Sequence, residues 1–153
     1  MGGFSAEERI ESLKVGIVGA IATGLAWLLT TGLNQFIPLP LQPILFQGDR
    51  LLSWAGVSQG AIAVVCGGLF GITYRYVIRT ETNGQLKTGA VFAFGGVRGL
   101  ALVEVGLRDG FPLWSLAIPV LEAVVWFAIA ALWIDVGLGR GWLKPWTGGT
   151  PDV

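Results

Sequence analysis

The chain has 153 residues, of which 53% are hydrophobic and 13% are charged, and its 10 basic and 10 acidic residues cancel. This composition is far from that of an ordinary soluble domain and indicates an integral membrane protein. The balanced charge excludes the strong positive field by which proteins attract nucleic acid. Histidine is absent and Cys66 is the only cysteine, so we expect no disulfide within the chain, no metal site and no cofactor that needs these ligands.

The chain begins with a polar segment, residues 1–12, which predicts a short helix on the membrane surface. Within it Ser5 and Glu8 have the spacing of a capping box. Four apolar stretches follow, each long enough to cross a bilayer as a helix. Together they predict an all-α, four-transmembrane-helix bundle over residues 13–135, with spans of about 15–33, 51–74, 88–107 and 113–134. Residues 136–153 are rich in glycine and proline and predict a loosely structured tail.

The connection between the first two spans contains three prolines within residues 37–46. Alternating prolines forbid a continuous helix, although most of the side chains are apolar. Backbone without internal hydrogen bonds is too costly in hydrocarbon. We therefore expect this segment to lie in the interface or to pack over the bundle as a cap.

The lysines and arginines outside the spans predict an orientation. With four spans, the amino terminus, the second connection and the tail share one side of the membrane. That side carries seven basic residues, and the opposite side carries two, Arg50 and Arg108. This positive-inside bias predicts that both termini face the cytoplasm or a stroma-like compartment. The seven are Arg9, Lys14, Arg75, Arg79, Lys87, Arg140 and Lys144.

Small residues recur every four positions in the first three spans. Such ladders let helix backbones approach closely, which is how helices gain packing energy in lipid. The ladders pack either this chain's own helices or, for one of them, a helix of a partner. They consist of Gly16, Ala20 and Gly24 in the first span, Gly56, Gly60, Gly67 and Gly71 in the second, and Gly95 and Gly99 in the third.

Arg98 and Glu122 are charges placed near the middle of the third and fourth spans, each twelve positions from Gly110 in the turn between them. If the two spans fold back at that turn, a rise of about 1.5 Å per residue puts both charges at the same depth. Gly95 and Gly99 beside Arg98 leave room for the neighbouring helix. The sequence therefore predicts an intramembrane Arg98–Glu122 ion pair, either as a static clamp or as part of a proton, ion or lipid-headgroup site.

Two further polar features accompany this pair. On the fourth span Ser115, Pro119, Glu122 and Trp126 form one stripe, in which Pro119 cannot donate a hydrogen bond to the Ser115 carbonyl. Near the end of the third span, Glu104 and Arg108 are four residues apart and predict a pair at the membrane edge.

Enzymatic motifs are lacking: the chain has no P-loop, dinucleotide fingerprint or nucleophile–base set, so no catalytic residue is predicted. A membrane-embedded lipid-modifying enzyme stays open. It would need a polar cavity that holds Glu104 or Glu122 beside a headgroup.

The segments Tyr74–Gly89 and Phe92–Leu100 resemble small conserved membrane proteins of cyanobacteria and chloroplasts. The resemblance implies a thylakoid membrane, or the plasma membrane of a cyanobacterium, and an accessory or assembly role around a photosynthetic complex. It assigns no functional residue.

The leading interpretation is a non-enzymatic accessory subunit or assembly factor, whose partners are the lipid bilayer and other integral membrane subunits. The alternative is a small transporter or channel whose pathway passes Arg98 and Glu122. The sequence leaves open a bound lipid or pigment and the oligomeric state.

Overall fold

A computed structural model describes residues 6–36, 53–78 and 83–146, and all of the regular structure in this part of the chain is helical. The elements are α1 (Ala6–Phe36), α3 (Trp54–Ile78), α4 (Gly84–Arg108), the 3-10 turn η1 (Leu113–Leu116) and α5 (Ala117–Gly139). The four long helices are long and apolar enough to cross a membrane. The predicted four-helix bundle is confirmed, whereas residues 37–46 and Ser5 lie outside the described residues.

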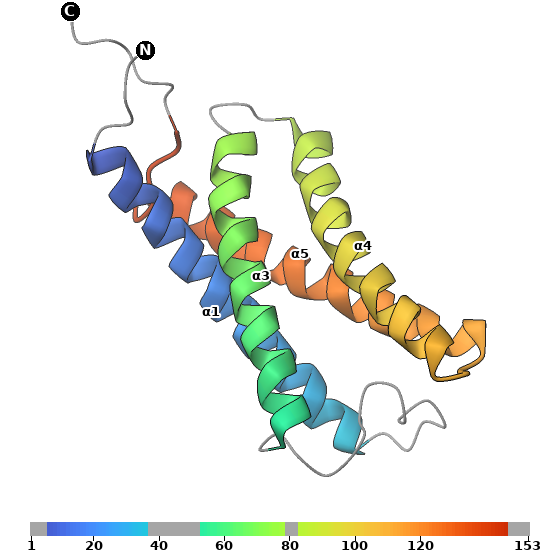
Figure 1. The fold of residues 1–153 in the computed structure, drawn as a ribbon. Coiled ribbons are helices and arrows are strands. Elements are labelled where there is room, and N and C mark those ends of the chain that lie inside the picture. The colour runs from blue at the N-terminus through green and yellow to red at the C-terminus, as the bar shows by residue number, and fades with distance from the viewer. Residues whose placement is uncertain (1–5, 37–52, 79–82, 147–153) are drawn as a thin grey trace, which may run out of the picture.

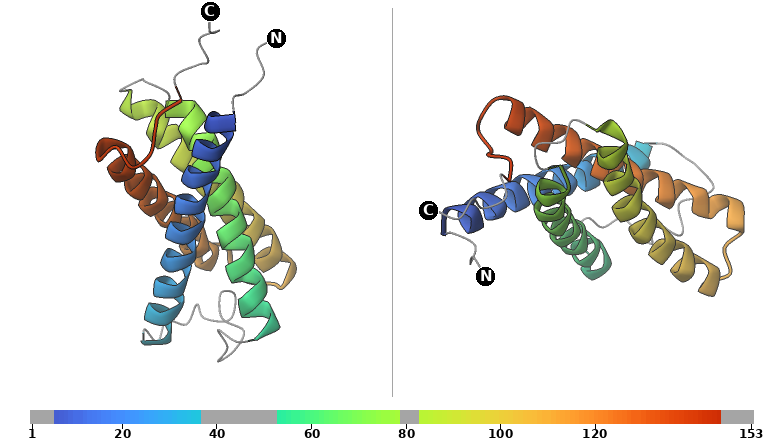
Figure 2. Two further views of the ribbon diagram at one scale, coloured as in Figure 1. Left: turned by 90° about the vertical axis from the view of Figure 1, so that its left-hand side faces the viewer. Right: turned by 90° about the horizontal axis from the view of Figure 1, so that it is seen from above.

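The helices are arranged as two antiparallel pairs (Figures 1 and 2). α1 packs mainly on α3, and α4 packs mainly on α5, while α5 also crosses behind to contact α1. α3 and α4 touch each other over only a short stretch and diverge toward the end of the bundle that carries the α4–η1 turn (Figure 1).

An aromatic cluster joins the two pairs. The Phe70 ring on α3 lies 5.2 Å from Phe127 on α5 and 5.3 Å from Phe94 on α4, measured between ring centroids. Phe70 and Phe127 are almost completely buried. Interlocked rings of this kind add packing energy beyond the area they bury. The cluster is therefore one contact that brings α3, α4 and α5 together in the core.

Local sequence signals explain where several helices begin and end. The Asn83 side chain accepts a hydrogen bond of 3.0 Å from the Gln85 N–H and so caps the start of α4. α4 ends in a Schellman motif, in which Gly110 has a φ of +79° and the Phe111 N–H bonds to the Gly106 carbonyl. The sharp reversal between α4 and α5 thus follows from a glycine that tolerates the left-handed conformation.

Several predicted boundaries differ from the structure. Residues 6–12, predicted as a separate surface segment, are the first turns of α1, and Ser12 is buried. α3 extends beyond residue 74 to Ile78, and α4 begins at Gly84, four residues before the predicted start at 88. In each case polar residues continue the helix because tertiary contacts at this end of the bundle hold their side chains.

The predicted loose tail is partly wrong. α5 runs through residues 136–139, and residues 140–146 fold back after a second Schellman motif at Gly141, which has a φ of +74°. Leu143 is buried in the core, against Gly137. This contact of Leu143 anchors the segment, and composition alone does not reveal it.

Candidate functional site

The packing of α4 on α5 fixes the positions of Arg98 and Glu122 relative to each other along the hairpin. A Cβ added to Gly95 would lie 2.7 Å from the Val124 Cα, and one added to Gly99 would lie 2.7 Å from the Val120 Cα. These backbones are therefore in direct contact, as the glycine ladder predicts. In the register that both contacts share, Arg98 and Glu122 lie at the same level of the hairpin.

The predicted Arg98–Glu122 ion pair is not formed. The ion pairs among the described residues join other groups, and Glu122 Oε1 accepts a hydrogen bond of 2.8 Å from Asn34 Nδ2 on α1. The reason is rotational. Val120 and Val124 face α4, and Glu122 lies two residues from each, about 200° around a helix that turns 100° per residue. Glu122 therefore faces α1.

Trp126, one turn further along α5 from Glu122, is the aromatic contact of Arg98. The Arg98 guanidinium carbon lies 5.0 Å from the centroid of the buried Trp126 ring, in cation–π geometry. Trp126 Nε1 donates a hydrogen bond of 3.2 Å to Thr30 Oγ1 on α1. The indole thus has one face against the cation and its N–H against α1.

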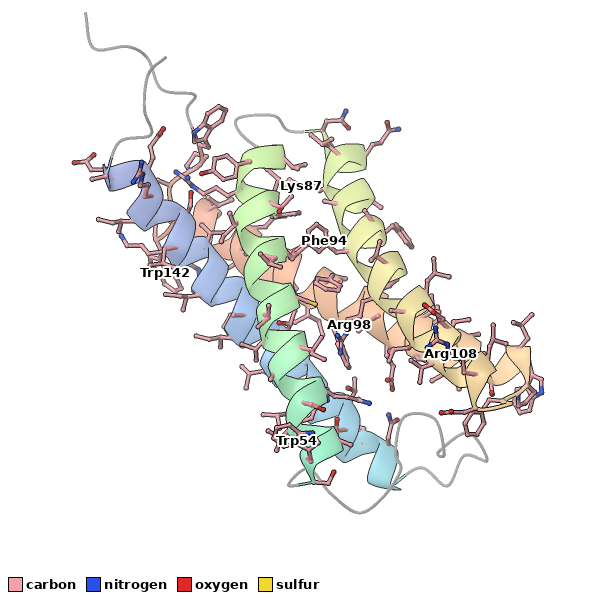
Figure 3. The ribbon with its side chains drawn as sticks, viewed as in Figure 1. Trp54, Lys87, Phe94, Arg98, Arg108 and Trp142 are labelled. Carbon is pink, nitrogen blue, oxygen red and sulfur yellow. The ribbon has the colours of Figure 1, made fainter. Side chains whose placement is uncertain are left out.

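The Arg98 side chain projects from α4 into the space between α4 and α3 (Figure 3). Its Nε is buried and has no hydrogen-bond partner among the described residues. Cys66 on α3 is the neighbouring group that interacts with the guanidinium. A thiol is a weak partner for a cation, so this arginine lacks the acid that the interior of a bundle ordinarily supplies.

Beyond the aromatic cluster, side chains of α3 and α4 that do not pack on α1 or α5 become exposed toward the α4–η1 turn. On α3, Ile62 is 52% exposed, whereas its neighbours Gly60 and Ala63 stay buried against α1. On α4, Val91 is 9% exposed, Arg98 is half-buried and Val105 is 53% exposed. Val91, Arg98 and Val105 share one face of α4, and Ile62 lies one turn from Cys66 on α3. We call the uncovered region between these faces the α3–α4 opening, and Arg98 lies where it begins.

The other predicted residues of the polar stripe have structural roles. Ser115 is buried in η1, and its Oγ donates a hydrogen bond of 2.7 Å to the Pro112 carbonyl. Pro119 is the third residue of α5, where no helical N–H donor is needed. The fourth span predicted from residue 113 is confirmed, with its first turn as the 3-10 helix η1 and regular α-helix from Ala117, since Pro119 cannot donate to the Ser115 carbonyl.

The predicted Glu104–Arg108 pair is confirmed. Arg108 Nη2 lies 2.6 Å from Glu104 Oε1, and both side chains are well exposed. An exposed pair at this spacing contributes only about 0.2–0.5 kcal/mol. The pair is therefore a surface feature at the end of α4, away from Arg98.

The ladders of α1 and α3 pack against each other. A Cβ at Gly71 would lie 2.5 Å from the Val15 carbonyl oxygen, and one at Gly16 would lie 3.0 Å from Ile72. Gly67 meets Gly19 and Thr23, both of which the sequence reasoning missed. The remaining ladder members have looser or different contacts: Gly60 with Trp27, Gly24 with Val64, Ala20 with Gly68, and Gly56, whose N–H bonds to the Ser53 hydroxyl.

Arg75 is a buried hub that the sequence reasoning missed, because it was assigned to a polar connection. It is 3% exposed, and its Nη1 donates a hydrogen bond of 2.6 Å to Ser12 Oγ on α1. Its Nε donates to the Lys144 carbonyl at 3.0 Å. Arg75 continues the face of α3 that carries Gly67 and Gly71, and that spacing is the signal that could have revealed it.

A second polar contact was also missed. Asp135 on α5 pairs with Lys87 Nζ on α4 at 3.0 Å and accepts from the Tyr74 hydroxyl on α3 at 3.3 Å. Together with Arg75 it ties all four long helices at the end of the bundle opposite the α3–α4 opening. Polar contacts therefore join all four helices at that end, whereas toward the other end the side-chain hydrogen bonds between described helices join α1 to α5.

These observations define the class: a four-span integral membrane protein with an intramembrane arginine that lacks an acidic partner among the described residues. The described residues contain no group of histidine, cysteine, aspartate or glutamate that could hold a metal ion. No protein-family model, curated protein or solved structure matches the chain. The resemblance to cyanobacterial and chloroplast membrane proteins stays a prediction.

Proposed function

We propose that this protein is a non-enzymatic accessory subunit or assembly factor of a larger membrane complex. The observation that carries the proposal is Arg98, a cation among apolar spans whose Nε is buried and has no hydrogen-bond partner in the part of the chain that the structure describes. An arginine near the centre of a membrane helix costs about 2.5–3.5 kcal/mol on insertion scales. A partner subunit that supplies the missing acceptor lowers this cost and gains association energy.

The proposal that this complex is photosynthetic rests on the resemblance alone. Segments Tyr74–Gly89 and Phe92–Leu100 resemble small conserved membrane proteins of cyanobacteria and chloroplasts, which implies a thylakoid setting, so the complex we propose is photosynthetic. Purification of the tagged protein from a cyanobacterium tests this setting, since photosystem or related subunits are then expected among the co-migrating chains.

A small transporter or channel is the second candidate. It is favoured by a row of polar groups that crosses three helices, from Arg98 on α4 through Trp126 on α5 to Thr30 on α1, with the Glu122–Asn34 contact beside it. A pathway along this row requires Glu122. The Glu122→Gln variant keeps an acceptor for Asn34 but removes the charge, so it should abolish flux in reconstituted vesicles while leaving assembly intact.

Gentle detergent purification tests the leading proposal. The wild-type protein should co-migrate with other membrane chains in constant ratio, and Arg98→Gln should lose them. Arg108→Gln is the matched control, because Arg108 lies on the same helix but is exposed and paired with Glu104. If the wild-type protein migrates alone, or if the control loses its partners equally, the proposal is wrong.

A further inference from the structure

We propose that the α3–α4 opening receives a transmembrane helix of a partner subunit, and that an aspartate or glutamate on this helix pairs with Arg98. This inference rests on the proposed accessory function and names the chemistry of its partner. Arg98, the half-buried Cys66 and the exposed Ile62 line the opening, and Trp126 lies behind the guanidinium.

Charge complementarity identifies the ligand group. The polar groups on the faces of α3 and α4 that border the opening are the Arg98 guanidinium, the thiol of Cys66 and the half-buried Gln59 two turns before Cys66, and Val105 continues an apolar wall toward the α4–η1 turn. The nearest intramembrane acid of this chain, Glu122, faces α1 and bonds to Asn34. The occupant that fits such a surface is apolar along its length and presents one carboxylate at the level of Arg98.

Depth distinguishes a protein helix from a lipid headgroup. Arg98 lies ten residues from the end of α4 at Arg108, which corresponds to about 15 Å along the helix. From the other end, at Gly84, it is about 21 Å away by the same rise. Headgroup phosphates lie outside a hydrocarbon core about 30 Å thick, so they do not reach this level. At that depth a polypeptide must satisfy its own backbone hydrogen bonds, so the occupant is a helix.

A second copy of this chain fits less well. Of its acidic residues on the described long helices, Glu104 is paired with Arg108 near the end of α4, Glu122 is turned inward to Asn34, and Glu7, Glu8 and Glu11 lie in the first turns of α1, at the end of the bundle that holds Arg75. Asp135 is paired with Lys87 at the opposite end of the bundle. None of these presents a free carboxylate to the outside at the level of Arg98, so the favoured occupant is a different chain.

Photo-crosslinking in native membranes tests the inference. Benzoylphenylalanine replaces Ile62 within the opening or, as the control, Leu29, which is 64% exposed on α1. The Ile62 probe should form an adduct with a different membrane protein, mapped to an apolar segment that contains an aspartate or glutamate. The Leu29 probe should not form this adduct.

Charge variants then test the pairing itself. Arg98→Gln should lower the adduct yield about tenfold or more, which corresponds to about 1.4 kcal/mol, and Arg98→Lys should retain most of it. Arg98→Glu should lose the adduct and regain it when the mapped acid of the partner is replaced by arginine. This rescue separates a lost contact from a misfolded variant.

The remaining outcomes overturn the inference. Adducts with lipid alone, with a second copy, or with a segment that has no acid all contradict it, as does a yield that Arg98→Gln leaves unchanged. If partners still co-purify in these cases, the accessory function stands and only the docking site is wrong. If no chain co-purifies with the wild-type protein, the accessory function itself fails.

Discussion

Arg98 and Glu122 show how two charges at one level of a hairpin can have separate environments. Glu122 is held by an amide on α1, and Arg98 lies against an indole on α5. A cation–π contact that is shielded from water contributes about 2 kcal/mol, which offsets much of the cost of placing an arginine in the membrane. The isolated chain can therefore keep Arg98 in the bundle without an ion pair.

A pair of double-mutant cycles tests this assignment. The cycle that combines Asn34→Leu with Glu122→Leu should give a coupling energy of about 0.6 kcal/mol and no more than about 1.7 kcal/mol, the range for hydrogen bonds between membrane helices. The cycle of Arg98→Leu with Glu122→Leu should give a coupling within about 0.5 kcal/mol of zero. Unfolding in mixed micelles measures both, and the reverse order of couplings would show that the two charges pair.

The sequence predicts the level of Arg98 and Glu122 in the membrane, but it does not predict which helix each side chain faces. The distance of each charge from Gly110 is a count along the chain, so the level of Arg98 and Glu122 was predictable. The direction of Glu122 depends on which face of α5 packs on α4. Valine and tryptophan are both acceptable at such an interface, so the sequence did not show that Val120 and Val124, and not Trp126, face α4.

At the scale of the helices, close backbone contacts at particular glycines determine the packing. Neighbouring glycines differ sharply: a Cβ at Gly67 would collide with Thr23 and the Gly19 carbonyl, whereas one at Gly68 would make ordinary contacts at 3.7 Å and beyond. Gly99 and Gly96 on α4 differ in the same way, since nothing lies within 4 Å of a Cβ at Gly96. The periodic spacing of small residues was visible in the sequence, but the collision at each position was not.

Alanine substitutions at these matched glycines should have opposite effects. Gly67→Ala and Gly99→Ala should each lower the free energy of unfolding by about 1–3 kcal/mol, because the helices must move apart. Gly68→Ala and Gly96→Ala should leave it unchanged or raise it by up to about 1 kcal/mol, because alanine favours the helix. Unfolding in mixed micelles checks each value, and equal losses at all four positions would contradict the packing.

For the whole molecule, the contrast between the two ends of the bundle is the main feature. Arg75 and Asp135 gather α1, α3, α4, α5 and the segment after α5 at one end, while the α3–α4 opening lies toward the other. The four spans were predictable because each is a long apolar run. The closed end was not, because charged residues beyond such runs are ordinarily read as solvated connections.

Arg75→Gln should loosen the closed end. The loss of hydrogen bonds from a charged donor to Ser12, Glu8 and Lys144 should lower the free energy of unfolding by about 3 kcal/mol or more. Trypsin should then cleave faster after Arg140, in the segment that Arg75 anchors. Arg108→Gln serves as the control and should change stability by less than about 1 kcal/mol. Equal cleavage rates in the wild type and Arg75→Gln would show that Arg75 does not hold this segment.

The bias of basic residues predicts an orientation in the membrane, which can be measured directly. In a background of Cys66→Ala, the exposed positions Arg9 and Asp109 are replaced one at a time by cysteine. In intact bacterial cells an impermeant maleimide should label Asp109→Cys, and it should label Arg9→Cys only after permeabilisation. Labelling in the opposite pattern would invert the topology.

The stability of the isolated chain with Arg98→Leu tests the central claim most directly. If Arg98 has no acidic partner within the chain, the free energy of unfolding in mixed micelles should rise or stay within about 1 kcal/mol of the wild type, because an uncompensated charge is removed. The same substitution should abolish co-purification of the partner chains. A fall of about 3–5 kcal/mol, which is the usual result of breaking a buried ion pair, would contradict the claim.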